Sequence, residues 1–242
     1  MKKRLQLLMT FLLLAGTFFL SRQGAALQAS HASAVIPSDN SMEENRDLPT
    51  VAIDPGHGAM DPGKIGTDGA LEKDINLAIC QYLKAELEAS GITVCLTRED
   101  DSPLYQETDT NKKKADMQAR IAKIQEAQPD IAVSIHQNSY PDPSVSGPQV
   151  FYYKSSSQGK TLADAIQKNF DYALEGRKNR AAKANEDYYL LLHTSCPIVI
   201  SECGFLSNAE ECAMLQEESY QKKIAHSVYL GIMEYFQLPV SS

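Results

Sequence analysis

Hydrophobic residues along this chain gather in short runs that have the length and composition of buried strands. The runs are rich in valine and isoleucine, and polar or turn-forming segments separate them. Five runs are expected to form strands: residues 50–53, 92–97, 130–135, 150–153 and 197–200. Nearly continuous apolar character, as in residues 130–135, is typical of a strand that is covered on both faces.

Between these runs, apolar residues recur three or four positions apart, which is the spacing of a helix with one buried face. Helices are expected at 73–90, at about 113–127, around 162–173 and around 224–236. Strands that alternate with amphipathic helices indicate an α/β fold. We therefore expect a single domain with a mostly parallel central sheet flanked by helices.

The first 34 residues have a different composition from the rest. Basic residues 2–4 precede an apolar run over residues 5–20, a pattern typical of a secretory signal peptide or an N-terminal signal anchor. Small residues within 25–34 can supply a cleavage site, whereas Arg22 directly after the apolar run fits a retained anchor equally well. Both alternatives stay open. In either case we expect an extracytoplasmic protein whose membrane contact is made only through this segment.

Residues 35–49 are polar and contain little that could form a core, so they are expected to be a flexible tether before a folded domain at 50–238. The whole chain has a net charge of −8. Without residues 1–34, which hold four basic and no acidic residues, 19 basic and 31 acidic residues remain, a net charge of −12. This acidic domain argues against a nucleic-acid partner.

The five cysteines do not form a recognisable framework. Their number is odd and none has the C-x-x-C spacing, so most are expected to be small buried hydrophobic residues. Pairing of Cys196 with Cys212 is the alternative in an oxidising compartment. Motifs of other hydrolases and of nucleotide-binding proteins, such as H-E-x-x-H, G-x-S-x-G and the Walker loop, are absent from the sequence.

Polar residues with metal-binding or acid–base chemistry directly follow three of the strand runs. His57 follows the first run within Asp-Pro-Gly-His-Gly, His136 ends the run at 130–135, and Glu202 follows the last run. The carboxyl ends of parallel strands meet at one edge of a sheet, so these residues are expected to converge. With Glu72 at the beginning of a helix, the two imidazoles form a three-ligand set for one Zn²⁺ ion. Glu202 remains as a general base that acts on a metal-bound water.

Each of these four residues also has a purely structural interpretation. His57 can be a surface turn histidine, and His136 can be a satisfied core histidine. Glu72 can be a carboxylate favoured by the helix dipole, and Glu202 a capping or salt-bridged acid. The Gly/Pro turn at His57, the polar residues after His136 and the joint presence of two imidazoles and a carboxylate favour the metal site.

Three further residues are candidates for supporting roles. Asp54 is placed to accept a hydrogen bond from an imidazole N–H, or it caps the turn. Asn138 either orients substrate or caps its loop. His193 precedes the last strand run and either contacts substrate or has a structural role.

Four segments in order resemble one known family. They are Val-Ala-Ile-Asp-Pro-Gly-His-Gly at 51–58, Leu-Glu-Lys-Asp at 71–74, Val-Ser-Ile-His-Gln-Asn at 133–138 and Ile-Ser-Glu-Cys-Gly-Phe-Leu-Ser-Asn at 200–208. Together they resemble the zinc-dependent N-acetylmuramoyl-L-alanine amidases of type 3. The similarity extends over roughly residues 50–237.

The resemblance implies that His57, Glu72 and His136 bind one Zn²⁺ ion and that Glu202 is the catalytic glutamate. It also implies hydrolysis of the amide between N-acetylmuramic acid and the first L-alanine of the peptidoglycan stem peptide. Glycan strands that carry stem peptides are then the substrate, and an accessory lipoprotein or activator is a possible partner. A short amidase with only an N-terminal leader looks like the spore-cortex, germination-specific type, which leads to muramic δ-lactam.

Departures from the family pattern concern Ala59, Lys64 and Gln137, which we expect at the rim of the site. Other activities compatible with the residues are those of a zinc-dependent carboxypeptidase or deacetylase of the cell wall. A non-catalytic wall-binding module is the remaining alternative. We expect the protein to act at the cell wall or the spore cortex, secreted or anchored by its N-terminal segment.

Overall fold

The computed structural model describes residues 48–174 and 180–240. The leader at 1–34 and most of the tether at 35–49 lie outside the described residues, so cleavage and anchoring stay predictions. Among the described helices, none has both the length and the apolar character that crossing a membrane requires.

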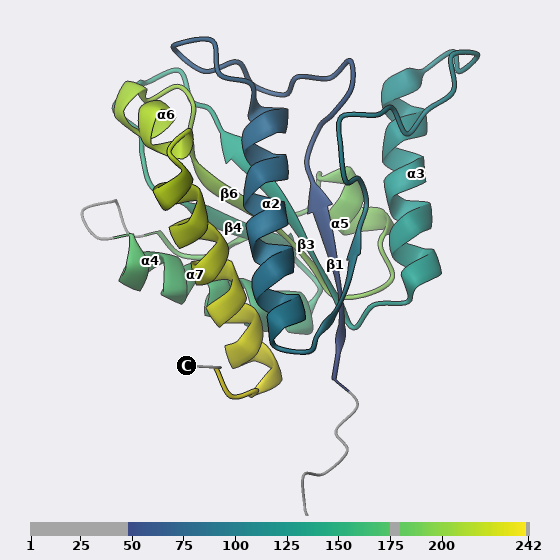
Figure 1. Cartoon of the computed structure of the whole chain (residues 1–242), viewed down its shortest axis with the longest axis vertical. Helices are drawn as coiled ribbons and strands as arrows, with labels where there is room; N and C mark the ends of the chain where they lie inside the picture. The colour runs from purple at the N-terminus through teal and green to yellow at the C-terminus, as the bar shows by residue number, and fades with distance from the viewer. Residues whose placement is uncertain (1–47, 175–179, 241–242) are drawn as a thin grey trace, which may run out of the picture. The chain divides into compact units, whose positions relative to one another are not determined.

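Six strands of the described residues form the central sheet (Figure 1). In spatial order they are β2 (Thr93–Leu96), β1 (Thr50–Pro55), β3 (Ile131–Asn138), β6 (Ile198–Phe205), β4 (Gln149–Tyr153) and β5 (Lys183–Asn185). The first four are mutually parallel, whereas β4 pairs with β6 in the antiparallel sense and β5 is parallel to β4. The predicted α/β class is confirmed, with a mixed sheet.

Helices cover both faces of this sheet. They are α2 (Glu72–Ala89), α3 (Lys112–Ala127), α4 (Ser157–Ala173), α5 (Tyr189–His193), α6 (Ala209–Leu215) and α7 (Glu218–Phe236). The four long helices lie where the apolar spacing predicts them. The short elements β5, α5 and α6 were not predicted, because segments of three to seven residues carry too little periodicity to be recognised.

The first face of the sheet is almost entirely apolar. Alternate residues of the strands, such as Val51, Ile53 and Val133, pack with side chains of α2, α4 and α7 in one buried cluster. Figure 1 shows α2 and α7 side by side across this face. Close packing of α7 on α4 requires Gly231, because a Cβ atom there would lie 2.6 Å from the Cα atom of Ile166.

The opposite face changes character along the strands. Its amino-terminal half is apolar, where Ala52, Ala132 and Ile198 pack with residues of α3 and α5. Two residues further along the same strands, Asp54 and Ser134 are register partners, and both are buried. Polar groups therefore gather toward the carboxyl ends of the strands, on the α3 and α5 face.

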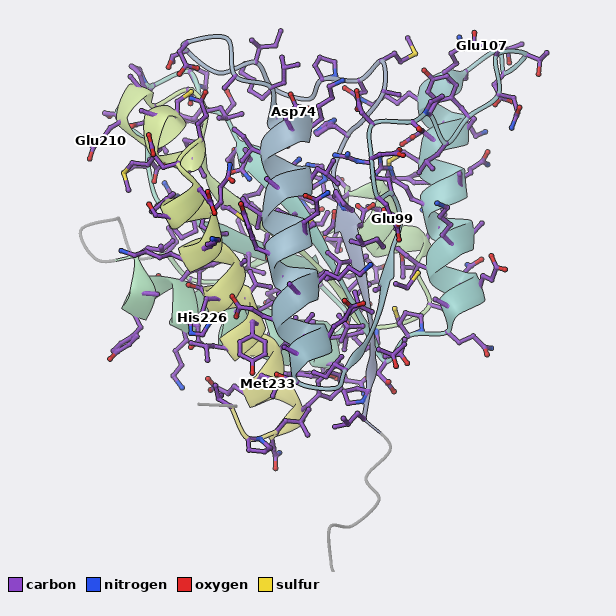
Figure 2. The ribbon with its side chains drawn as sticks, viewed as in Figure 1. Asp74, Glu99, Glu107, Glu210, His226 and Met233 are labelled. Carbon is purple, nitrogen blue, oxygen red and sulfur yellow. The ribbon has the colours of Figure 1, made fainter. Side chains whose placement is uncertain are left out.

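Charged side chains outside this region lie at the surface or form contacts between helices. Figure 2 shows Asp74 at the beginning of α2 and His226 on the outer side of α7. His226 Nδ1 lies 2.8 Å from the carboxylate of Glu86, which joins α7 to α2.

All five cysteines are free thiols in the structure. The thiol of Cys212 donates to Asp68 Oδ1 at 3.2 Å and is not paired with Cys196.

Candidate metal centre and active site

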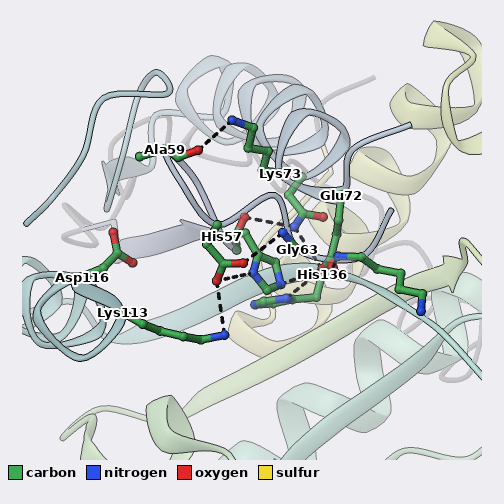
Figure 3. A network of polar contacts seen from close by, with 12 residues as sticks. His57, Ala59, Gly63, Glu72, Lys73, Lys113, Asp116 and His136 are labelled. Carbon is green, nitrogen blue, oxygen red and sulfur yellow. Dashed lines mark hydrogen bonds and ion pairs between the residues drawn. The ribbon is translucent and has the colours of Figure 1, made fainter. Parts of the chain in front are cut away.

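The structure brings the two histidines and Glu72 together from three separate segments. His57 lies in the loop after β1, Glu72 begins α2, and His136 lies near the end of β3. Glu72 Oε1 is 3.2 Å from His57 Nε2 and 3.0 Å from His136 Nδ1, and the ring centroids of the histidines are 4.9 Å apart. Figure 3 shows the three side chains pointing toward one another.

The carboxylate of Glu72 is held by main-chain donors as well as by the imidazoles. Oε1 accepts a hydrogen bond from the Gln137 N–H at 3.0 Å, and Oε2 accepts one from the Lys64 N–H at 2.7 Å. Burial opposes ionisation of this group, but its contacts with His136 and His57 outweigh burial and hold the pKa of Glu72 well below its usual range. Glu72 is thus a fixed, ionised carboxylate.

His57 is oriented through both its main chain and its ring. Its φ of 61° lies in the left-handed region, which non-glycine residues rarely adopt. The ring Nδ1 lies 3.0 Å from Asp61 Oδ2, so that Nε2 faces Glu72. Burial lowers the pKa of His57, but Glu72 and Asp61 raise it above its usual value. Asp61 therefore fixes which nitrogen of His57 faces the site.

Two glycines leave the space that these side chains occupy. A Cβ atom on Gly56 would lie 2.3 Å from the His136 ring, and one on Gly63 would lie 2.6 Å from both Glu72 Oε2 and His57 Cδ2. Real Cβ atoms do not approach other atoms so closely, so any side chain at either position would displace one of these three residues. The Gly-rich loop is in this way shaped around the three-residue site.

The donor set and its spacing fit a zinc ion. Nitrogen and oxygen ligands at about 2.0–2.2 Å in a tetrahedron lie about 3.3–3.5 Å from each other. The two contacts of Glu72 Oε1, at 3.2 Å and 3.0 Å, require only a small outward movement to reach this spacing. The three candidate donor atoms all lie within 4.8 Å of one another. Two imidazoles and one carboxylate also leave a fourth position of the tetrahedron open.

Glu202 lies next to this group on the neighbouring strand. It is the register partner of His136, its side chain is buried, and its Oε2 has no hydrogen-bond partner among the described residues. Burial raises the pKa of Glu202 to about 7, with a further contribution from Glu72, while the imidazoles of His136 and His57 act in the opposite direction. A carboxylate that titrates near neutral pH can both accept and return a proton.

A cleft of about 870 Å³ opens over the three-residue site and Glu202. Its far wall is formed by α3, the loop before it and the α5 region, and includes Met117, Tyr188 and Leu190. Tyr188 lies near enough to Glu202 for that carboxylate to raise the pKa of the Tyr188 hydroxyl, after the larger effect of burial. The cleft thus has an apolar and aromatic side at the α5 region, whereas the α3 side also carries charged residues such as Lys113 and Asp116.

The structure differs from the expectation for Asp54. Its carboxylate accepts hydrogen bonds from Thr97, Ser134 and Arg120, and none of the hydrogen bonds in the described residues joins it to an imidazole. Burial raises the pKa of Asp54, but these three groups outweigh burial and lower it to about 2. The left-handed turn at His57 directs the ring toward Asp61 instead.

Asn138 and His193 lie outside the cleft lining. Asn138 Oδ1 accepts from the Ser139 N–H at 2.7 Å, which is the loop-capping alternative of its prediction. His193 is exposed, stacks on Tyr189 with ring centroids 3.9 Å apart, and contacts the Tyr189 carbonyl. None of these three contacts involves His57, Glu72 or His136.

Of the three residues expected at the rim, the predicted position was wrong for Gln137. It is buried, lines the cleft from within, and its side-chain amide donates to Asn76 Oδ1 at 3.1 Å. Strand β3 continues through Gln137, so the residue is covered by α2 rather than exposed in a loop. Ala59, with a φ of 50°, and Lys64 lie in the loop between β1 and α2.

Residues 51–234 match the family model described as N-acetylmuramoyl-L-alanine amidase, Amidase_3. The chain belongs to this amidase family. It is 35% identical over 189 residues to the germination-specific N-acetylmuramoyl-L-alanine amidase of Bacillus subtilis, covering 77% of this chain and 79% of that protein.

Solved structures of family members have the same fold. The structure of the CwlD amidase from Clostridioides difficile, in complex with the GerS lipoprotein, matches with a TM-score of 0.76 and 40% identity, over 78% of this chain and 98% of that one. The catalytic domain of the amidase CwlV from Bacillus (Paenibacillus) polymyxa matches with a TM-score of 0.69 and 30% identity, over 79% and 100% of the two chains.

Proposed function

We propose that this chain is a zinc-dependent amidase that hydrolyses the bond between N-acetylmuramic acid and L-alanine in peptidoglycan. One observation carries the proposal: an unpartnered, buried carboxylate oxygen of Glu202 lies beside a set of two imidazoles and one carboxylate at the base of a cleft. Membership of the amidase family supports the choice of this amide as the substrate bond.

In this mechanism His57, Glu72 and His136 would hold one zinc ion, which when bound would act as a Lewis acid toward the scissile carbonyl and lower the pKa of a nearby water. Glu202 Oε2 accepts a proton from the attacking water, because no donor of the described residues occupies this oxygen. The same oxygen returns the proton to the alanine nitrogen when the C–N bond breaks. The products are a free lactyl carboxylate and a stem peptide with a free amino terminus.

Digestion of purified peptidoglycan with the full chain, followed by mass spectrometry, tests the reaction. We expect intact stem peptides that begin with free L-alanine. Treatment with a chelator should abolish their release, and stoichiometric zinc should restore it. Loss of terminal D-alanine would identify a carboxypeptidase, and loss of acetate a deacetylase. Binding to the glycan without any cleavage would indicate a wall-binding module. Each of these three results would contradict the proposal.

We further propose that the substrate is the spore cortex. The name of the Bacillus subtilis relative, a germination-specific amidase, supports this role. In a spore-forming host, deletion of the gene should remove muramic δ-lactam from the cortex, and the native chain should restore it. A Glu202→Gln chain, expressed at the same level, is the matched control and should not restore it. Normal δ-lactam in the deletion strain would contradict the cortex role.

We also propose that the chain acts outside the cytoplasm together with a lipoprotein. The solved complex of the CwlD amidase with the GerS lipoprotein supports such a partnership. The substrate lies outside the membrane, and the N-terminal segment provides the route. Addition of the host's corresponding lipoprotein should raise turnover of cortex peptidoglycan by the purified chain. Full turnover that the lipoprotein leaves unchanged would contradict the need for a partner.

A further inference from the structure

Arg120 is a charged residue in an unusual place. It lies on α3 and is only 1% exposed, although a guanidinium group keeps its charge in proteins. A buried charge is costly unless each of its donors has a partner. The hydrogen-bond partners of Arg120 therefore indicate its role in the structure.

The guanidinium group binds the strand end and turn that carry His57. Arg120 Nη1 donates to Asp54 Oδ1 at 2.8 Å and to the Pro55 carbonyl at 2.6 Å. Nη2 donates to the carbonyl of His57 itself. Nε donates to Asp116 Oδ2 at 2.6 Å, one turn earlier on α3, which fixes the direction of the side chain. One planar group thus connects α3 to residues 54–57.

The turn that it holds is strained. The left-handed conformation of His57, at a φ of 61°, is unfavourable for a residue with a side chain and persists only where the surroundings impose it. Arg98 provides part of this support, through hydrogen bonds to the carbonyls of Pro55 and Gly56. Arg120 is the donor that reaches the carbonyl of the ligand residue, and it lines the cleft as well.

A simpler interpretation is that Arg120 only neutralises Asp54. Asp54 already accepts hydrogen bonds from Thr97 and Ser134, at 2.5 Å and 2.6 Å, and a single positive charge would suffice for neutralisation. The contacts to two carbonyl groups require the fork of donors that arginine has and lysine lacks. The geometry of the contacts therefore distinguishes the two interpretations.

We infer that Arg120 is a positioning residue for the metal site: it fixes the main chain of His57 and thereby sets the affinity of the site for zinc. This inference rests on the proposed function, since it concerns the same metal. Asp61 orients the His57 ring from its side chain, and Arg120 orients the same residue from its main chain.

Arg120→Lys is the decisive variant, because it keeps the charge and removes the fork. Zinc dissociation constants are measured by competition with a chromophoric chelator, and thermal unfolding of the metal-free chains is recorded in parallel. We expect the dissociation constant of Arg120→Lys to rise by about 10–100-fold, the range found when groups that orient metal ligands are removed. Asp116→Asn, which keeps an acceptor oxygen for Nε but removes the charge that pairs with it, should weaken zinc binding less but in the same direction.

Gln167→Met is the matched control. Gln167 is buried and also bridges a helix to a strand through main-chain contacts, to Val150 N and Pro148 O, but lies away from the site. Its variant should unfold at a lower temperature and bind zinc as the native chain does.

Guanidinium ion at millimolar concentration should tighten zinc binding by Arg120→Ala and leave zinc binding by Arg120→Lys unchanged.

The outcomes separate this inference from the proposed function. If the native chain binds no zinc, the proposed function fails and the inference fails with it. If the native chain binds zinc and folded Arg120→Lys binds it within about twofold of native, the inference alone is overturned. Where Arg120→Ala does not fold, Arg120→Lys and Asp116→Asn decide, and native zinc affinity in both would overturn the inference.

Discussion

Val51 and Ile53 of β1 lie in the apolar cluster beneath α2, whereas Ala52 and Asp54 of the same strand face α3. The two faces of the sheet thus share their strands but differ in chemistry. The first face is mostly apolar, with Gln137 as a buried polar exception beneath α2, and it packs against α2, α4 and α7. The second face carries buried polar and ionised groups toward the carboxyl ends of the strands. Strand alternation therefore places the apolar core on one face and the polar site on the other. Substitutions on the first face should change stability, and substitutions at the site should change zinc binding or turnover.

Removal of the proposed general base should have the largest effect. Glu202→Gln keeps the shape of the side chain but cannot accept the proton, so turnover should fall by about 10²–10⁴-fold. Zinc content should stay at one ion per chain, because Glu202 is not part of the ligand set. Release of stem peptides and metal analysis of the same sample measure both. Near-native turnover in a zinc-loaded variant would show that this face does not hold the base.

A cavity in the apolar face should act on stability alone. Leu83 of α2 is fully buried, and Leu83→Ala should lower the free energy of unfolding by about 2–5 kcal/mol. Folded molecules of this variant should bind zinc with native affinity. Urea unfolding and chelator competition measure the two quantities. A parallel loss of zinc affinity would contradict the separation between the faces.

The buried carboxylate of Glu202 should give the metal-free chain a defined pH dependence. Its pKa is about 7 in the folded state against an ordinary 4.5, so the folded state binds more protons than the unfolded state between these values. Stability from this group therefore falls as pH rises through that window, by about 3 kcal/mol. Metal-free Glu202→Gln should lack this decrease, and its stability relative to native should rise accordingly. Urea unfolding at about pH 4 and about pH 8 measures the difference; parallel profiles would be incompatible with a desolvated carboxylate.

Replacing a glycine by alanine should have different effects on the two faces of the sheet. Gly56→Ala places a Cβ atom against the His136 ring, so we expect zinc affinity to fall by about 10–100-fold. Gly231→Ala places a Cβ atom 2.6 Å from Ile166 between α7 and α4, which is also too close, and should lower stability without weakening zinc binding. Chelator competition on both variants is the test. Equal zinc affinity in the two would remove the distinction.

Much of the fold, and the clustering of the site residues, can be predicted from the sequence. Periodicity identifies the long helices and the buried strands, and the polar residues directly after the strands identify His57, His136 and Glu202 as neighbours. Glu72 becomes a candidate ligand only in their company. These predictions succeed because parallel strands deliver their carboxyl ends to one edge.

Other features depend on three-dimensional contacts that no local pattern encodes. The apolar run of β4 has the same appearance in either direction, so its antiparallel pairing was not foreseen. Asp54 and Asp61 flank His57 at similar distances along the chain, and only the left-handed turn selects Asp61. Arg120 lies in a helix where arginine is ordinarily exposed. Its role becomes visible only once α3 is placed beside the turn.

The central claim is that His57, Glu72 and His136 hold one zinc ion next to Glu202. A crystal structure of the zinc-loaded chain, with anomalous diffraction recorded on both sides of the zinc absorption edge, tests it most directly. We predict a single anomalous peak bonded to His57 Nε2, Glu72 Oε1 and His136 Nδ1, with the Glu202 carboxylate facing the open position. A peak held by other residues, or no peak at this site in a chain that releases stem peptides, would contradict the account.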